Sequence, residues 1–425
     1  MADRPTDSGP QTSVIDILVI DDDLLVAQSL QRLLKKRGYR VETASNADIG
    51  IQKAIQLTPS VVICDLLLPG GPSGLDICNR IKQDPQLSTT AVLIMTGHTD
   101  LANRVEALEA GADDLLFKPV DTAELAARVK SGLRIHQLTQ ALKVQKHRLE
   151  QELAEAATYV SSLLPRDTPE DASNCISISS RFISSQELGG DCFDHYWLDP
   201  DYLVMYLLDV SGHGLGAALL STSVLNVLRS QSLPGVNFYR PETVLKGLNE
   251  TFQMDDQNDK YFTIWYGVYN RTTHQLAYAS AGHPPALLVT PAPIKPSHRN
   301  RYGQYGQSHS DLKISTPSLK IEQLRTPGMP IGMMPDSNYQ WQRCNVAHNS
   351  RLYIFSDGIY EIPTVSDAEN NEPDTLLGLN GFVQLLTALE SKGELSLDSL
   401  IHSVSSFSGN HFEDDLSLLE VDFQL

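Results

Sequence analysis

Several acidic residues of this chain stand at the ends of apolar, strand-like runs. They are Asp191, Asp209, Asp357 and Asp414. The run 202–208 is almost continuously apolar and leads to Asp209, which a glycine-rich turn follows. A carboxylate in such a place has no packing role and is hard to bury, which favours a ligand role. Because these residues are far apart in the sequence, the fold must bring their strand ends together to make one site.

Composition limits the class of protein. The 425 residues are too many for one ordinary domain and indicate about three units. A formal net charge of −19 argues against nucleic acid or an anionic membrane as the main partner. The five cysteines include no Cys-x-x-Cys pair, so neither a disulfide framework nor a structural zinc site is expected. No signal peptide or membrane span is recognisable, so we expect a cytoplasmic protein.

From residue 14 onward, apolar strand-like runs alternate with amphipathic stretches. Strands are expected at 17–20, 61–64, 91–95 and 115–117, and a helix near 24–37. This alternation predicts an α/β fold with a doubly wound parallel sheet and helices on both faces. In such sheets ligands bind at the carboxyl ends of the strands.

Polar residues follow these predicted strands at that edge. They are Asp21 and Asp22, Asp65, Thr96 and Lys118. Three neighbouring acids can hold one Mg²⁺, while a hydroxyl and an ammonium can hold phosphate oxygens. Asp65 is then the natural acceptor of a phosphoryl group, as an acyl phosphate.

The chain resembles the response-regulator receiver family in four motifs. They are residues 20–22, 65–69, 95–97 and 117–119. The resemblance implies a flavodoxin-like fold and phosphorylation of Asp65 by a sensor histidine kinase or a phosphotransfer protein. It also implies one Mg²⁺ held by Asp21, Asp22 and Asp65. Leu115 stands where the family usually carries Tyr or Phe, which puts the usual aromatic switch in question, and the loop after Asp65 is one residue longer than usual.

Residues 122–164 predict one long helix that ends before Pro165. Its apolar residues at seven-residue spacing are Ile135, Leu142, Leu149, Ala156 and Leu163. This repeat predicts a short coiled coil and a homodimer, although Thr139 and Lys146 interrupt the companion positions. An amphipathic helix packed on its own domain is the alternative interpretation.

Beyond residue 168 the chain is rich in β-branched and aromatic runs. Strands are expected at 176–183, 202–208, 262–269 and 276–279, with helices at 217–228, 241–252 and near 377–389. Carboxylate ligands without His or Cys partners select Mg²⁺ or Mn²⁺ over zinc. Two such ions can bind phosphate oxygens and lower the pKa of a bridging water, which predicts hydrolysis of a phosphomonoester.

Seven motifs of this part of the chain resemble, in the same order, those of the metal-dependent type 2C protein serine/threonine phosphatases of the SpoIIE- and RsbU-like branch. They are residues 189–194, 209–214, 262–267, 281–285, 328–332, 355–358 and 414–418. The resemblance implies an α-β-β-α sandwich with two Mn²⁺ or Mg²⁺ ions. It also implies a phosphorylated protein substrate, an anti-sigma-factor antagonist of a partner-switching pathway. The implied metal ligands are Asp191, Asp209, Asp357, Asp414 and the carbonyl of Val210.

Other enzyme classes fit the sequence less well. Residues 189–193 differ by one from the Gly-Gly-Asp-Glu-Phe signature of diguanylate cyclases, but Cys192 replaces the acidic residue and Asp357 and Asp414 would have no role. A cysteine phosphatase is excluded because no His-Cys is followed by Arg six residues later. A receiver scaffold without catalysis remains the alternative that failure of metal binding would favour.

The sequence therefore predicts four segments: a flexible tail at 1–13, a receiver at 14–134, a coiled-coil connector at 135–165 and a phosphatase domain at 170–425. The segment 291–317, rich in Ser, Gly, Gln, His and Tyr, is expected to be a long loop. Phosphorylation of Asp65 is expected to control removal of phosphate from phosphoserine or phosphothreonine of a protein partner.

Overall fold

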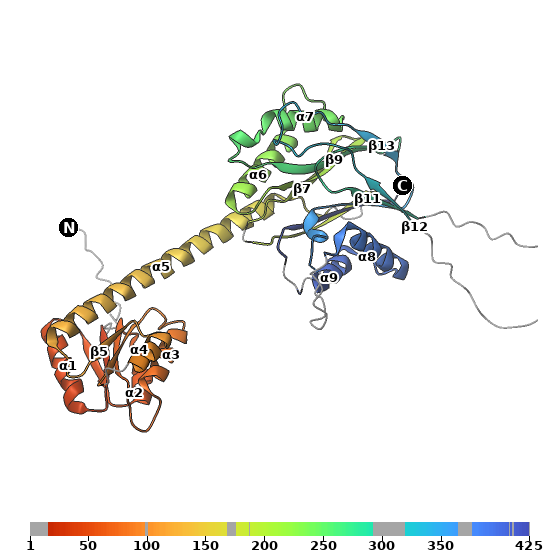
Figure 1. Ribbon diagram of the computed structural model, residues 1–425. Helices are drawn as coiled ribbons and strands as arrows, with labels where there is room; N and C mark the ends of the chain where they lie inside the picture. The colour runs from red at the N-terminus through yellow and green to blue at the C-terminus, as the bar shows by residue number, and fades with distance from the viewer. Residues whose placement is uncertain are drawn as a thin grey trace, which may run out of the picture. The chain divides into compact units, whose positions relative to one another are not determined.

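The computed structural model describes residues 16–97, 101–167, 176–186, 188–291, 319–363, 376–407, 409 and 412–424. The chain divides into two compact units, Met1–Glu150 and Gln151–Leu425 (Figure 1). The predicted tail 1–13 and all but the first residue of the predicted loop 291–317 lie outside the described residues. The finer boundaries of the predicted segments remain predictions.

A five-stranded sheet forms the centre of the first unit. Its strand order is β2-β1-β3-β4-β5, and all neighbouring strands run parallel, as predicted. No bounds were predicted for the edge strand β2, whose sequence Val-Glu-Thr-Ala is short and half polar. The strands are β1 (Ile17–Ile20), β2 (Val41–Ala44), β3 (Val61–Asp65), β4 (Ala91–Thr96) and β5 (Asp114–Phe117).

Helices cover both faces of this sheet. Apolar residues of α2, α3 and α4 pack on one face, and those of α1 and α5 pack on the other. Since alternate side chains of a strand point to opposite faces, the central strands must be apolar along their whole length, and polar groups are displaced to their ends. The helices are α1 (Leu24–Lys36), α2 (Ala47–Leu57), α3 (Gly74–Gln83), α4 (Leu101–Glu109) and α5 (Thr122–Leu163).

Helix α5 is a single helix of 42 residues, as the sequence predicted. Leu125 and Val129 in its first turns are buried against the sheet. Further along, the apolar residues of the seven-residue repeat lose this cover, and Ile135, Leu142 and Leu149 are 39%, 67% and 57% exposed. The described residues of the chain therefore leave these apolar side chains uncovered, and the coiled coil remains a prediction.

Two antiparallel five-stranded sheets form the second unit. The first has the order β13-β10-β9-β8-β7 and the second the order β12-β11-β14-β15-β6. The strands of the first sheet are β7 (Cys192–Asp199), β8 (Tyr202–Val210), β9 (Phe262–Asn270), β10 (Gln275–Ala281) and β13 (Gln342–Asn345). Those of the second are β6 (Ile176–Ile183), β11 (Ala286–Pro291), β12 (Leu319–Leu324), β14 (Ser350–Phe355) and β15 (Leu416–Phe423).

The two sheets pack face to face, with helices on their outer faces (Figure 1). Helices α6 (Leu215–Arg229) and α7 (Pro241–Thr251) cover the first sheet, whereas α8 (Gly378–Lys392) and α9 (Leu397–Phe407) cover the second. One face of each sheet thus lies in the core between the sheets and the other lies under helices. This arrangement confirms the predicted α-β-β-α sandwich.

Candidate functional site

The predicted acids of the first unit meet at the carboxyl end of its sheet. Asp21 and Asp22 follow β1, Asp65 ends β3, and these two strands are parallel neighbours. Their ligand oxygens all lie within 4.8 Å of one another. Asp21 is fully buried and Asp65 is nearly so, whereas Asp22 is exposed. Three carboxylates at this spacing suit one Mg²⁺, which binds through few carboxylates and keeps several waters.

Lys118 balances the charge of this pocket. Its Nζ lies 2.9 Å from Oδ2 of Asp21 and 2.9 Å from Oδ2 of Asp65. Burial works to lower the pKa of Lys118, but the two carboxylates outweigh it and raise the pKa. Burial raises the pKa of Asp65, and Lys118 opposes that shift. The ammonium therefore stands directly beside the oxygen that would accept a phosphoryl group.

The remaining pocket residues flank this pair. Thr96 ends β4 and is buried, and its register partner on β5 is Phe117, the residue before Lys118. The structure thus brings Thr96 and Lys118 to adjacent strand ends. Leu115 lies within β5 and is 6% exposed, in the apolar core between the sheet and its helices. A buried aliphatic side chain here cannot rotate a polar ring tip toward the pocket, as a tyrosine could.

In the first sheet of the second unit, strand register makes two of the predicted ligands neighbours. Asp191 immediately precedes β7, and Asp209 is the penultimate residue of β8. These strands are antiparallel, with Cys192 opposite Leu208, so Asp191 and Asp209 occupy adjoining positions. A Cβ atom at Gly190 would lie 2.8 Å from the carbonyl oxygen of Val210. Glycine at this position therefore leaves that carbonyl accessible, as a ligand role requires.

In the second sheet, register again makes two predicted ligands neighbours. Asp357 follows β14 and Asp414 precedes β15, and these strands are antiparallel with Phe355 opposite Leu418. The backbones approach so closely that a Cβ at Gly358 would lie 2.2 Å from the carbonyl oxygen of Asp415. The fold thus brings all four predicted aspartates to two pairs of strand ends, one pair from each sheet.

The charges of the two pairs act on one another's pKa values. Burial raises the pKa of Asp209 to about 8, and the charges of Asp357 and Asp414 contribute to that shift. Burial also raises the pKa of Asp191 well above its usual range, with Asp209 as the next cause. For Asp357 the pKa rises to about 6, through burial and then Asp414. Asp414 is exposed and Asp209 and Asp357 are half-buried, so the carboxylates of the two sheets repel one another across a space that water reaches only in part.

This cluster fits divalent cations. Oδ2 of Asp191 is buried and has no hydrogen-bond partner, a costly state for a carboxylate oxygen unless a ligand satisfies it. Across the described residues, no lysine or arginine forms an ion pair with any of the four aspartates. Among the described residues of the second unit, no three acidic side chains bring their ligand oxygens within 4.8 Å of one another, as the three receiver acids do.

Asp415 belongs to this cluster, although the sequence analysis assigned no role to it. It is 3% exposed, and its Oδ2 accepts a hydrogen bond from the amide of Gly190 at 2.6 Å. Its Oδ1 accepts one from the amide of Ser185 at 2.9 Å. Asp415 thus fastens the start of β15 to the loop that carries Asp191. The doubled acid at 414–415 was the only signal for it, and sequence alone does not tell which of two adjacent side chains points inward.

His283 is a second residue whose position only the structure reveals. It is 1% exposed, and its Nδ1 lies 3.0 Å from Oγ1 of Thr263, the register partner of Asp209. Burial lowers the pKa of His283 to about 3, so the ring is neutral. It therefore supports the strand next to Asp209 without adding charge to the cluster.

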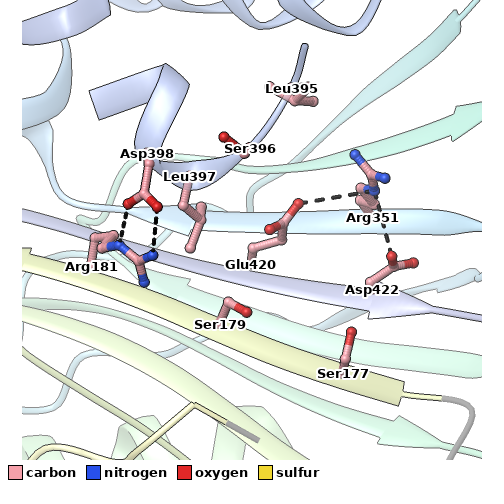
Figure 2. A pocket seen from close by; sticks show the side chains of 10 residues that line it. All are labelled: Ser177, Ser179, Arg181, Arg351, Leu395, Ser396, Leu397, Asp398, Glu420 and Asp422. Atoms are coloured by element: carbon pink, nitrogen blue, oxygen red, sulfur yellow. Dashed lines mark hydrogen bonds and ion pairs between the residues drawn. The ribbon is translucent and has the colours of Figure 1, made fainter. Parts of the chain in front are cut away.

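A polar pocket lies over β6, β14 and β15 near the start of α9 (Figure 2). Its charged side chains are paired with one another: Arg181 binds Asp398 at 2.7 Å, and Arg351 lies 3.6 Å from Asp422. None of the four predicted metal ligands lines it. Because its charges are already satisfied, this pocket is not the candidate site.

Two family models match the chain. The response regulator receiver domain matches residues 17–130, and Stage II sporulation protein E (SpoIIE) matches residues 199–304 and 307–424, together more than half of the chain. The transcriptional regulatory protein ResD of Bacillus subtilis is 33% identical to this chain over 29% of this chain and 50% of ResD. The transcriptional regulator RpaA of Synechocystis is 35% identical over 28% of this chain and 48% of RpaA. The chain spans about half the length of the curated relatives it matches.

Solved structures are also similar. The SiaA-PP2C domain of Pseudomonas aeruginosa is 16% identical, with a TM-score of 0.48, and the match covers 66% of this chain and 98% of that domain. The RsbU and RsbW domains of Rv1364c from Mycobacterium tuberculosis are 21% identical, with a TM-score of 0.42, over 58% of this chain and 59% of that one.

Among the described residues, no helix has both the length and the apolar character needed to cross a membrane.

Proposed function

Because this chain belongs to the SpoIIE family of PP2C-type phosphatases and carries an N-terminal receiver domain, we propose that it is a response regulator whose output is dephosphorylation of a phosphoserine or phosphothreonine protein. One observation carries the proposal. Asp191 and Asp209 of the first sheet and Asp357 and Asp414 of the second lie close enough for their charges to raise one another's pKa. Oδ2 of Asp191 is buried without a hydrogen-bond partner, and no lysine or arginine of the described residues forms an ion pair with the four carboxylates. Such a cluster is costly to fold and has a clear use as a metal site.

In this proposal Asp191, Asp209, Asp357 and Asp414, with the Val210 carbonyl, hold two Mn²⁺ or Mg²⁺ ions. Bound ions of this kind neutralise the carboxylates, bind phosphate oxygens and lower the pKa of coordinated water. The protein contributes the positions of these oxygen ligands, which lie at four strand ends and face the same space. Asp415 keeps the Asp191 loop in place, and neutral His283 supports the strand beside Asp209.

The receiver supplies control. Asp65 attacks the phosphorus of a phosphodonor, a histidine kinase or phosphotransfer protein, and the bond to the donor's nitrogen breaks as the aspartyl phosphate forms. Lys118, which already contacts Asp65, and the Thr96 hydroxyl are placed to hold the phosphate oxygens. Asp21 and Asp22 complete the Mg²⁺ site with Asp65.

Helix α5 is the proposed route of communication, because it carries residues of both units. Its exposed Ile135, Leu142 and Leu149 would pair with the same residues of a second copy. With Leu115 in place of an aromatic switch, a shift in this pairing is the proposed signal. Phosphorylation can act in this way only if it stabilises one of two helix arrangements over the other. The proposed substrate remains an anti-sigma-factor antagonist.

The activity is tested with the full chain, p-nitrophenyl phosphate and added Mn²⁺, with EDTA as the control. Hydrolysis that EDTA abolishes supports the proposal. If neither Mn²⁺ nor Mg²⁺ supports hydrolysis although Asp65 can be phosphorylated, the result would favour a receiver scaffold without catalysis. Formation of a cyclic dinucleotide from GTP would favour the cyclase.

The connector is tested by inserting four residues after Leu149, which rotates the two ends of a helix by about 40° at ~3.6 residues per turn. We expect the insertion to leave basal hydrolysis intact and to uncouple it from beryllofluoride, which mimics phosphate on Asp65. Unchanged regulation, or a monomer by light scattering with and without beryllofluoride, would refute control through paired helices.

A further inference from the structure

Arg325 is an exposed cation at the end of the sheet where the carboxylates gather. It follows Leu324, the last residue of β12, whose register partner on β11 is Ala286. Strands β12 and β14 are both antiparallel to β11, so they run in the same direction. Strand β14 leads to Asp357. Arg325 and Asp357 therefore leave the second sheet at the same end.

The backbone on both sides of Arg325 is fastened to the other sheet. The carbonyl of Leu324 accepts a hydrogen bond from Nε1 of Trp265 at 2.9 Å. On the other side, the amide of Thr326 donates to Oγ of Ser280 at 2.9 Å, and the amide of Ser280 donates to Oγ1 of Thr326 at 2.8 Å. Trp265, Ser280 and Thr326 are buried, whereas Arg325 is exposed. The fold thus presents this one side chain to solvent from a rigid support.

The guanidinium of Arg325 has no carboxylate partner in the part of the chain that the structure describes, unlike those of Arg181 and Arg229, which are paired with aspartates. Leu324 pairs with Ala286 of β11, and the neighbouring Leu287 pairs with Tyr353 of β14, four residues before Asp357. Arg325 is therefore an exposed cation, unpaired among the described residues, at the sheet end where β14 leads to the acidic site.

We propose that Arg325 binds a carboxylate of the protein substrate next to the phosphoresidue, so that the enzyme prefers acidic phosphopeptides. This inference rests on the proposed phosphatase function. An anionic phosphopeptide must approach a chain with a net charge of −19, so a local cation is needed to offset repulsion. The planar guanidinium matches a carboxylate with two parallel hydrogen bonds. Because Arg325 is exposed at the rim, it reaches the flanking peptide rather than the phosphate above the four aspartates.

The test compares two phosphoserine peptides that differ only in glutamate or glutamine beside the phosphoserine, together with p-nitrophenyl phosphate. The variants are Arg325→Ala and Arg325→Glu. Arg343→Glu is the matched control, because Arg343 is also exposed and lies on the edge strand β13 opposite Ala277, away from the end of β10 near the site. All proteins are assayed as the full chain with Mn²⁺.

For the glutamate peptide we expect kcat/KM to fall about three- to fivefold in Arg325→Ala and about tenfold or more in Arg325→Glu, mainly through KM, as for loss and reversal of an exposed charge pair. The glutamine peptide, p-nitrophenyl phosphate and Arg343→Glu should change less than about twofold, as for surface changes away from a contact. The loss should shrink as salt is added.

Two results would overturn the inference. If kcat/KM for p-nitrophenyl phosphate falls as much as kcat/KM for the glutamate peptide, Arg325 contacts the phosphate itself. If the wild type and Arg325→Glu each hydrolyse both peptides with equal kcat/KM, Arg325 has no role in selecting acidic substrates. If the wild type hydrolyses none of the three substrates, the proposed phosphatase function fails instead. The wild-type reactions therefore separate the two failures.

Discussion

The receiver pocket and the carboxylate cluster of the second unit both collect aspartates at strand ends, but they balance the negative charge differently. In the receiver, Lys118 lies 2.9 Å from both Asp21 and Asp65. In the cluster, no lysine or arginine pairs with the four predicted ligands among the described residues, and the pKa of Asp209 rises to about 8. The receiver pocket thus carries its own counter-charge, whereas the cluster must take up protons or cations.

This difference separates two uses of the same side chain. A carboxylate beside a fixed ammonium stays available as a nucleophile with a steady charge. Carboxylates that repel one another bind a divalent cation at the expense of protons, because the ion removes the repulsion that favoured protonation. We therefore expect the receiver to keep its geometry without metal, and the second unit to depend on metal for both stability and activity.

The largest expected effect is the loss of a metal ligand. Asp209→Ala or Asp357→Ala should lower hydrolysis of p-nitrophenyl phosphate with Mn²⁺ by a factor on the order of 10² or more, comparable to losing a preorganised charge-stabilising group. Asp201→Ala is the control, because Asp201 immediately precedes β8 at the end opposite Asp209 and is exposed. Full activity in Asp357→Ala would refute the metal-site assignment.

Next in size is the loss of regulation when the receiver acceptor is removed. Asp65→Asn should leave basal hydrolysis unchanged but bring the ratio of activities with and without beryllofluoride to one. The wild-type ratio should lie within about 5- to 150-fold, as is usual for coupling between sites. Lys118→Ala should still accept phosphate from acetyl phosphate yet give no response. Beryllofluoride binding that survives in Asp65→Asn would contradict the assignment.

A smaller effect should separate the two adjacent acids at 414–415. Asp414→Asn removes a predicted ligand and should reduce activity like the changes above. Asp415→Asn keeps one oxygen to accept a backbone hydrogen bond, so we expect activity to fall less than about tenfold and unfolding free energy by about 1–3 kcal/mol. Chemical denaturation and the Mn²⁺-dependent rate measure these two outcomes. If Asp415→Asn abolishes activity and Asp414→Asn does not, the roles are reversed.

The smallest signal is a proton release on metal binding. At pH 6.5, below the pKa of about 8 of Asp209, metal-free protein holds this proton, and the pKa of Asp191 is also raised, so Mn²⁺ should release at least about one proton per chain. Calorimetry in buffers of different ionisation enthalpy measures it. Since the folded pKa exceeds the usual 3.8, the contribution of Asp209 to stability is present at low pH and is lost as pH rises toward 8. Metal-free protein that melts at the same temperature at pH 5 and pH 8 would contradict this sign.

The sequence alone predicted both fold classes and most of the candidate site. Apolar runs ending in Asp65 or Asp209 placed these residues at strand ends, since periodicity defines strands and the polar interruption defines where they stop. The bounds of the edge strand β2 could not be predicted because half of it is polar. Asp415 escaped prediction because the choice between adjacent acids depends on the register of β15 against β6 and on the nearby Gly190 amide.

What the sequence determined by itself was local: which residues carry oxygen or nitrogen ligands, which segments are strands or helices, and where each strand ends. Only the tertiary structure decided what these ends do to one another. The packing of the two sheets brought Asp209 close enough to Asp357 to raise its pKa, and strand register placed Arg325 at the same sheet end as Asp357, where no described carboxylate pairs with it. Charge repulsion depends on distance and on exclusion of water, and neither quantity exists until the sheets are packed.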